Sequence, residues 1–487
     1  MKMNFKKYTL TAFVSGLALT AIGQSQKTYP LDFSGNRYQV KEVAVAGNTF
    51  QVRAFENIVY VGKPVDTNVQ VMNIYIPEAY FQGKLVGRYS AATAPVFFPN
   101  QVGGYMPARP ASLPSTANTR ESALQVALSK GYVVASAGAR GRTSQDNNGR
   151  HTGKSPAALV DLKAAIRYLK FNDKKMPGNA AKIITNGTSA GGAMSALLGA
   201  TGNNADFIPF LKALGAAEAE DDVFAVSAYC PITNLDHADM AYEWQFNGLN
   251  TYQQRGRPSA SAQAVNLLND AQIKVSAELK SLFPAYVNAL KLKANDGKLL
   301  SLDDSGEGNF KELVKSYVIA SAQKAMDSGA DLSEHQWLTV ISGKVINLDF
   351  QGYVRYMERM KTPPAFDALD LSSPENQEFG DETIDKKHFT GFSLARATTT
   401  AVLADLAAVK MLNPMNYIGQ PKTNTATHWR IRHGAKDKDT GLAIPVLLAT
   451  TLKNKGYEVD LELPWDKPHS GDYDLDELFQ WMGAISR

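Results

Sequence analysis

The stretch Lys182–Gly192, with the sequence KIITNGTSAGG, decides the fold of this chain of 487 residues. Its apolar residues Ile183 and Ile184 predict a β-strand, and the small residues from Gly192 onward predict a helix. Between them, Ser189 lies in the pattern Gly-x-Ser-x-Gly. A sharp strand-to-helix turn holds such a serine in a strained conformation with its hydroxyl exposed, which makes it a candidate nucleophile. Because about 0.1–0.2 such matches arise by chance in a chain of this length, the surrounding sequence must decide.

Length and charge narrow the classes of protein to consider. With 487 residues, 44% of them hydrophobic, the chain can bury a large core and is long for one plain domain. We therefore expect one large domain with an insertion, or two domains. The net charge of +4 falls to about +1 without the three lysines of the N-terminal leader. Neither nucleic acid nor an anionic membrane surface is expected as a partner.

The first residues predict a targeting segment. Lys2, Lys6 and Lys7 precede the mostly apolar run Thr9–Ile22, and Gly23 completes a small-x-small cleavage site. This pattern is typical of a secretory signal peptide over residues 1–23, with the mature, secreted chain (periplasmic or extracellular) beginning after Gly23. The alternative is a membrane anchor, which the run is too short to form comfortably because a spanning helix needs about 20 residues.

Two regions of alternating strands and helices flank a segment of different character. Strands are predicted at Val69–Ile76, Ala94–Phe98, Tyr132–Ser136, Ala225–Cys230, Trp429–Arg432 and Val459–Leu463. Helices are predicted at Pro156–Lys170, Gly192–Leu198, Leu442–Leu452 and Leu475–Ile485. This alternation is typical of a parallel sheet covered by helices. Together with the serine turn it predicts an α/β-hydrolase fold, a mostly parallel sheet flanked by helices.

The middle of the chain predicts a large, mainly helical insertion. Ser261–Leu290 and Phe310–Met326 have helical spacing and no strong strand alternation. We expect the hydrolase core to comprise residues 24–240 and 400–487, with an inserted lid domain at 241–399. The alternative is an independent helical domain without a role in the active site.

A serine nucleophile needs an acid and a histidine, which follow it in that order in this fold. Of the seven histidines, only His469 lies in the loop after the last predicted strand. A Gly-x-x-Asp turn after the preceding strand offers Asp437, which we favour over the nearby Asp439. Asp437 would hold His469 in the tautomer that accepts the Ser189 proton. The alternative for His469 is a solvent-exposed loop histidine.

The developing oxyanion needs two backbone N–H groups. Ala190, directly after the nucleophile, supplies one, and the loop after the strand that ends near Phe98 supplies the other. That loop contains Gly103 and Gly104, between which the sequence does not discriminate. The alternative is that these glycines form only a tight turn.

A single cysteine, Cys230, excludes an intrachain disulfide and a typical structural zinc site. We expect Cys230 to pack as a small buried hydrophobic residue. The proposed chemistry needs no metal and no organic cofactor.

Four longer blocks carry a resemblance to a known family. They are PNQVGGYM (99–106), GTSAGG (187–192), YCPITNL (229–235) and PHSGDYD (468–474). These blocks resemble the bacterial tannases (tannin acylhydrolases), which are secreted or cell-associated α/β-hydrolases with a large inserted lid domain. Carried over, the tannase triad falls on Ser189, Asp437 and His469.

The resemblance also implies a substrate and residues that bind it. Tannases hold the three phenolic hydroxyls of a galloyl ring with a lysine, a glutamate and an aspartate, and the matching positions are Lys361, Glu375 and Asp439. It implies hydrolysis of galloyl ester bonds, and by extension depside bonds, in hydrolysable tannins and gallate esters, a small phenolic substrate being the expected partner. Without the resemblance, Lys361 and Glu375 would be interpreted as solvated lid charges. The alternatives are a feruloyl or aryl carboxylesterase, a peptidase with the same triad, and a catalytically silent binding protein.

Overall fold

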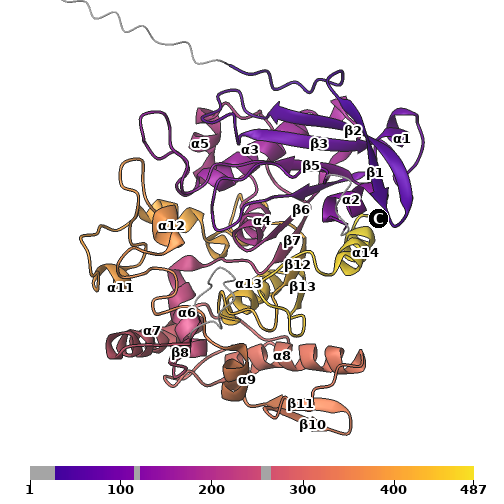
Figure 1. Ribbon diagram of the computed structural model, residues 1–487. Helices are drawn as coiled ribbons and strands as arrows, with labels where there is room; N and C mark the ends of the chain where they lie inside the picture. The colour runs from indigo at the N-terminus through magenta and orange to yellow at the C-terminus, as the bar shows by residue number, and fades with distance from the viewer. Residues whose placement is uncertain (1–27, 115–120, 254–264) are drawn as a thin grey trace, which may run out of the picture.

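A nine-stranded sheet forms the centre of the computed structural model, which describes residues 28–114, 121–253 and 265–487 (Figure 1). The strand order is β1-β2-β3-β5-β4-β6-β7-β12-β13. Strands β4 to β7, β12 and β13 pair in parallel, and β1, β2 and β3 add antiparallel pairs at one edge. The strands are β1 Gln39–Val45, β2 Asn48–Val59, β3 Val71–Pro77, β4 Pro95–Pro99, β5 Val133–Ala137, β6 Asn179–Thr188, β7 Ala225–Tyr229, β12 His428–Arg432 and β13 Glu458–Glu462.

Most of these strands are buried on both faces because helices cover them. Strands β3, β4, β5 and β7 have no exposed residue, which explains their continuous apolar runs. The flanking helices are α2 Ala123–Ser129, α3 Ala157–Phe171, α4 Ala190–Ala200, α13 Ala443–Asn454 and α14 Leu475–Ile485. Helix α14 contacts α2, and its Phe479 ring packs 5.7 Å from that of Phe97 in β4. The predicted strands and helices match the observed ones to within a few residues and confirm the α/β-hydrolase fold, whereas β1, β2 and α2 were not predicted.

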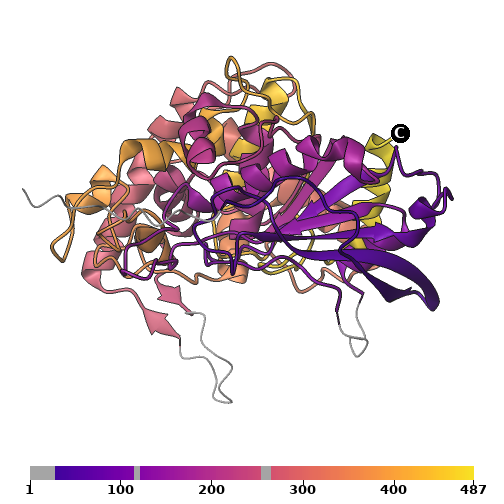
Figure 2. The same cartoon turned by 90° about the horizontal axis from the view of Figure 1, so that it is seen from above.

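A long segment between the neighbouring strands β7 and β12 forms the lower part and the left side of Figure 1. It contains α6 Leu235–Phe246, α7 Asp270–Ala289, α8 Asn309–Asp327, α9 Phe350–Met357, α10 Pro374–Glu378, α11 Gly391–Leu394 and α12 Leu406–Met411. The Trp244 ring in α6 packs 5.3, 6.1 and 5.6 Å from those of Phe283, Phe310 and Phe350. Figure 2 shows this segment, in pink to orange, on the side of the molecule away from the indigo N-terminal strands.

The segment is mainly helical, as predicted, but its details differ from the prediction in two ways. It contains two small antiparallel sheets, β8 Thr251–Tyr252 with β9 Asn266–Leu267, and β10 Leu338–Ile341 with β11 Lys344–Leu348. The helix predicted over Ser261–Leu290 lies outside the described residues as far as 264, and among the described ones it begins at Asp270, because Asn269 caps it: the Asn269 side chain accepts a hydrogen bond from the backbone N–H of Gln272.

The predicted leader, residues 1–23, lies outside the described residues. Among the helices that the structure describes, none is long and apolar enough to cross a membrane.

Candidate active site

Ser189 stands alone between the end of β6 at Thr188 and the start of α4 at Ala190. Its backbone dihedrals are φ +63° and ψ −126°, a conformation that costs free energy for a residue with a side chain. Three backbone hydrogen bonds hold it: Ser189 N–H donates to Tyr229 O (3.0 Å), and the N–H groups of Ala193 (2.9 Å) and Ile232 (3.3 Å) donate to Ser189 O. The hydroxyl is therefore presented at the tip of a sharp, fixed turn.

The glycines around Ser189 are required by close backbone approach. A Cβ added to Gly187 would lie 2.3 Å from Gly191 O, and one added to Gly192 would lie 2.4 Å from Tyr229 O. Neither neighbour is a flexible side chain, so a larger residue would open the turn.

The predicted acid and base are hydrogen-bonded to each other. His469 Nδ1 lies 2.8 Å from Asp437 Oδ2 and 3.7 Å from Asp439 Oδ2. Asp437 is completely buried, and its Oδ1 accepts the N–H of Asp439 at 2.9 Å. Burial alone would raise the pKa of Asp437, but the imidazoles of His433 and His469 and the Cys230 thiol outweigh it and hold the pKa well below its ordinary value. Asp437 is therefore the carboxylate placed to orient His469.

The loop that carries His469 packs directly on the serine turn. Asn186 Nδ2, at the end of β6, donates to Asp472 Oδ1 at 3.0 Å. A Cβ added to Gly471 would lie only 1.8 Å from Thr188 Oγ1. Residues two and three positions after the histidine thus touch the strand end that presents Ser189.

The predicted oxyanion loop is fixed beside the first turn of α4. Asn100 Nδ2 donates to Gly191 O (3.0 Å) and to Ser195 Oγ (3.1 Å). Gly103 and Gly104, a few residues on, are exposed, and a Cβ added to either would meet nothing within 4 Å. Both N–H groups thus belong to an exposed part of the loop that Asn100 joins to α4, and the choice between the two glycines stays open.

The three predicted ring-binding residues interact electrostatically: the charges of Lys361 and Asp439 both affect the pKa of Glu375. Glu375 is buried at 9% exposure, which corrects its interpretation as a solvated charge. Burial raises the pKa of Glu375; the charges of Lys361 and Arg142 oppose that rise, and Asp439 adds to it. Since Asp439 Oδ2 is also 3.7 Å from His469 Nδ1, the three predicted ring-binding residues lie near the predicted base.

Two further residues, which the sequence analysis did not single out, connect these parts. Arg142 Nε donates to Gly104 O at 2.9 Å, and its Nη1 donates to Gln377 Oε1 on α10. Tyr242 on α6 accepts the Lys361 N–H and donates to the carbonyl of Lys438, both at 3.1 Å. The position of Arg142 just after β5 could have indicated a role in the site, because ligands of open α/β sheets bind at the carboxyl ends of strands.

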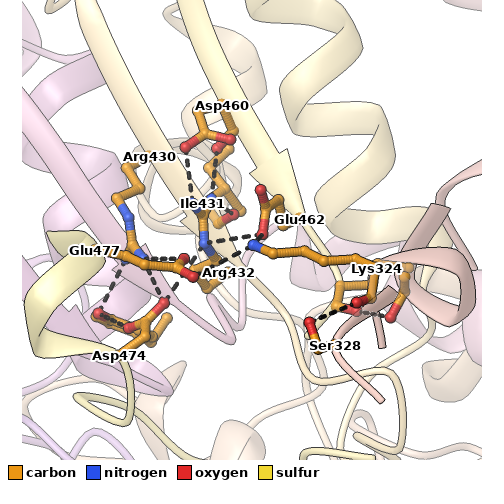
Figure 3. Close-up of polar contacts among 12 residues, drawn as sticks. Lys324, Ser328, Arg430, Ile431, Arg432, Asp460, Glu462, Asp474 and Glu477 are labelled. Carbon is orange, nitrogen blue, oxygen red and sulfur yellow. Dashed lines mark hydrogen bonds and ion pairs between the residues drawn. The ribbon is translucent and has the colours of Figure 1, made fainter. Parts of the chain in front are cut away.

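A buried arginine and an exposed ion pair hold the loop that carries the predicted base, His469 (Figure 3). Arg430, which is 0% exposed, pairs with Asp474 and donates to the Tyr229 hydroxyl at 2.9 Å. The same Tyr229 hydroxyl donates to Asp474 Oδ1 at 2.6 Å. Lys324 of α8 reaches Glu462 at 2.8 Å and so joins the inserted segment to the edge strand β13. The loop from β13 to α14 is therefore held at its far end as well as at His469.

Among the residues that the structure describes, two sets of side chains have the chemistry to hold a metal ion. They are Cys230 with His433 and Asp437, and Asp437 with Asp439 and His469, in each of which the ligand atoms lie within 4.8 Å of one another. Both sets use Asp437, so an ion at either one would occupy the carboxylate that now orients His469.

Solved structures of one enzyme family are similar to this chain. A tannin acyl hydrolase from Lactobacillus plantarum is 48% identical, with a TM-score of 0.90 over 94% of this chain and 99% of that chain. The tannase of Fusobacterium nucleatum is also 48% identical, with a TM-score of 0.90 over 94% of this chain and 100% of that one. A tannin acyl hydrolase in complex with ethyl gallate is 48% identical, with a TM-score of 0.89 over 94% of this chain and 99% of that one.

A family comparison agrees with the fold. The BD-FAE family model matches residues 111–290, a range that includes the serine turn. A comparison with curated proteins gave no match. Identity of 48% over 94% of the chain nevertheless establishes the family. The resemblance noted in the sequence is confirmed: the chain belongs to the tannases (tannin acyl hydrolases) and is a carboxylic ester hydrolase.

Proposed function

We propose that this protein hydrolyses galloyl esters to gallic acid and an alcohol, with Ser189, His469 and Asp437 as its catalytic triad. The observation that carries the proposal is the grouping of Lys361, Glu375 and Asp439 beside the His469–Asp437 pair. The similarity to a tannin acyl hydrolase bound to ethyl gallate adds support.

In the proposed reaction, Ser189 Oγ attacks the ester carbonyl carbon while His469 Nε2 takes the hydroxyl proton. Asp437, hydrogen-bonded to Nδ1, stabilises the imidazolium that forms. The oxyanion accepts hydrogen bonds from the N–H of Ala190 and of Gly103 or Gly104. His469 then returns the proton to the leaving alkoxide, the carbon–oxygen bond of the ester breaks, and a galloyl ester of Ser189 remains. Water, deprotonated by His469, hydrolyses that ester and releases gallic acid.

Specificity in this proposal comes from the ring-binding residues. Glu375 and Asp439 accept hydrogen bonds from adjacent phenolic hydroxyls, and the Lys361 ammonium favours partial phenolate character. A ring without those hydroxyls would leave the buried Glu375 charge without hydrogen-bond donors, and polar sites discriminate strongly in this way. Lys361 and Glu375 belong to the inserted segment, so we propose that this segment acts as the lid of the site.

We further propose that residues 1–23 form a signal peptide and that the mature protein is secreted. The support is the lysine-rich start and the apolar run of the sequence. Expression with the native leader, followed by N-terminal sequencing of the exported protein, tests this directly. An N-terminus at Gln24 is expected; retention of the whole leader in the membrane fraction would instead indicate an anchor.

The substrate class is tested by comparing methyl gallate, methyl ferulate and methyl benzoate with the purified mature chain. Release of gallic acid should dominate, and Lys361→Ala and Glu375→Ala should abolish that preference. A preference for ferulate that survives both substitutions would exclude a galloyl site. Labelling with a serine-directed phosphonate separates an enzyme from a silent binding protein, and label that persists in Ser189→Ala would show that the nucleophile is another residue.

A further inference from the structure

Cys230, the only cysteine, lies between the strand end that contacts Ser189 and the loops that carry Asp437 and His469. It follows β7 with a backbone φ of +45° and is 0% exposed. The carbonyl of the preceding Tyr229 accepts the N–H of Ser189 at 3.0 Å. The Cys230 sulfur lies 3.3 Å from the carbonyl oxygen of Ser470, the residue after His469.

The thiol also lies beside the Asp437 carboxylate: its sulfur and a carboxylate oxygen are within 4.8 Å of each other, and the thiol lowers the pKa of Asp437 as a hydrogen-bond donor does. A thiol has one proton, and a carboxylate is a stronger acceptor than a backbone carbonyl because it is charged. Burial and the Asp437 charge raise the pKa of Cys230 well above its ordinary value, so the thiol keeps that proton. The expected packing as a buried hydrophobic residue therefore describes its burial but misses its polar role.

No other described donor replaces the thiol on that side of the carboxylate. Asp437 Oδ1 accepts the N–H of Asp439, and Oδ2 accepts His469 Nδ1. His433 Nδ1 is 3.7 Å from Oδ2, beyond hydrogen-bond distance, and burial lowers the pKa of His433. The titratable groups that face the Cys230–Asp437 pair are His433, Asp439, His469 and Tyr473.

We infer that Cys230 is a positioning residue for the esterase reaction: its S–H holds the Asp437 carboxylate in the plane that orients His469, and its sulfur supports the histidine loop at Ser470. The inference rests on the proposed triad. It assigns the only cysteine of the chain to the catalytic geometry rather than to packing alone.

The test uses Cys230→Ala, which removes the donor, and Cys230→Ser, which restores one. Ser227→Ala is the matched control, because Ser227 is equally buried on β7 and its hydroxyl has no hydrogen-bond partner. Stoichiometric phosphonate labelling of Ser189 counts the competent sites, so that kcat is expressed per folded enzyme even where a variant folds poorly. Methyl gallate hydrolysis then gives kcat, KM and the pH profile of kcat/KM.

For Cys230→Ala we expect about a tenfold lower kcat per labelled site with KM within about twofold. The acid limb of the profile should move to higher pH, because a carboxylate that has lost a donor stabilises the His469 imidazolium more strongly. Cys230→Ser should recover most of the loss, and Ser227→Ala should match the wild type.

Two results would overturn the inference. One is wild-type kcat per labelled site and an unmoved pH profile in Cys230→Ala. The other is an equal loss in Cys230→Ala and Cys230→Ser, which would indicate a packing role only. Failure of the proposed substrate can be told apart from failure of this inference. If the wild type releases no gallic acid, the proposed substrate is wrong.

The rate of phosphonate labelling does not depend on the acyl group, so it still tests the role of Cys230. We expect Cys230→Ala to be labelled about tenfold more slowly than the wild type.

Discussion

Gly471 is fitted against Thr188 so closely that a methyl group on its Cα would lie 1.8 Å from Thr188 Oγ1, 2.9 Å from its Cβ and 3.0 Å from its Cγ2. Rotation of the threonine cannot relieve this overlap, because all three atoms of the side chain are involved. The contact joins the loop of His469 to the strand end that presents Ser189. Glycine at this position therefore sets the separation of the predicted base and nucleophile.

Gly471→Ala should displace His469 from Ser189 and reduce kcat for methyl gallate by about 10²-fold, because a shift of about 1 Å in a catalytic group costs that much. The melting temperature should fall much less than the activity, since the change affects a loop. Gly35→Ala is the control, because a Cβ there meets nothing within 4 Å. Full activity in Gly471→Ala would show that the contact of Gly471 with Thr188 does not determine the position of His469 relative to Ser189.

Removing the ammonium of Lys361 should slow the hydrolysis of galloyl esters more than that of esters without phenolic hydroxyls. Lys361→Ala should lower kcat/KM for methyl gallate by about 10- to 100-fold, because a hydrogen bond to a charged group contributes about 1.5–3 kcal/mol. Hydrolysis of methyl benzoate, which offers no phenolic hydroxyl, should change by less than about threefold. Equal losses on both esters would place Lys361 outside the ring site.

The dependence of KM for methyl gallate on pH, on the acid side, should reveal the protonation of Glu375. Since burial raises its pKa above the ordinary glutamate value, the carboxylate becomes protonated at a higher pH than an exposed glutamate does. As the pH falls through that raised pKa, the site loses an ionised acceptor, and KM for methyl gallate should rise. KM for methyl benzoate should stay level.

Glu375→Gln is the matched variant, since it keeps the shape and removes the titration. Its KM for methyl gallate should be about tenfold higher at neutral pH and should no longer rise on the acid side. A KM that still rises there would assign the titration to another group.

The part of this fold that sequence alone predicts is the part that is buried on both faces. Strands such as β4 and β5 are continuous apolar runs because helices cover them. The hairpin of β1 and β2 was missed because its strands are partly exposed and carry interspersed charges. Its signal was the two-residue turn Ala46–Gly47, where both residues have positive φ.

The same distinction applies to the site. Chain order and loop position suggest Ser189, Asp437 and His469, because the fold fixes where each must fall. Arg142 and Tyr242 act through contacts with Gln377 and Lys361, partners more than one hundred residues away. No periodicity encodes such contacts, because they arise only when the inserted segment packs on the core.

The final prediction concerns the ion pair of Arg359 and Glu243, which are both completely buried. Arg359 Nη1 donates to Glu243 Oε2 at 2.9 Å, and Arg359 Nε donates to the carbonyl of Lys361 at 2.7 Å. Glu243→Gln leaves the guanidinium without a counter-charge, so the free energy of unfolding in urea should fall by about 3–5 kcal/mol. KM for methyl gallate should also rise, because Arg359 fixes the backbone of Lys361.

The control for this pair is Arg396→Met, which breaks the 2.8 Å pair with Glu278 between side chains that are 39% and 33% exposed. An exposed pair contributes at most about 1 kcal/mol, so this variant should lose little stability and no affinity for gallate. Replacing both buried partners, as Arg359→Met with Glu243→Leu, should recover much of the stability because no unpaired charge remains. It should not recover the KM, because methionine cannot donate to the Lys361 carbonyl. Recovery of both together would show that Arg359 acts on the ring site through folding stability alone.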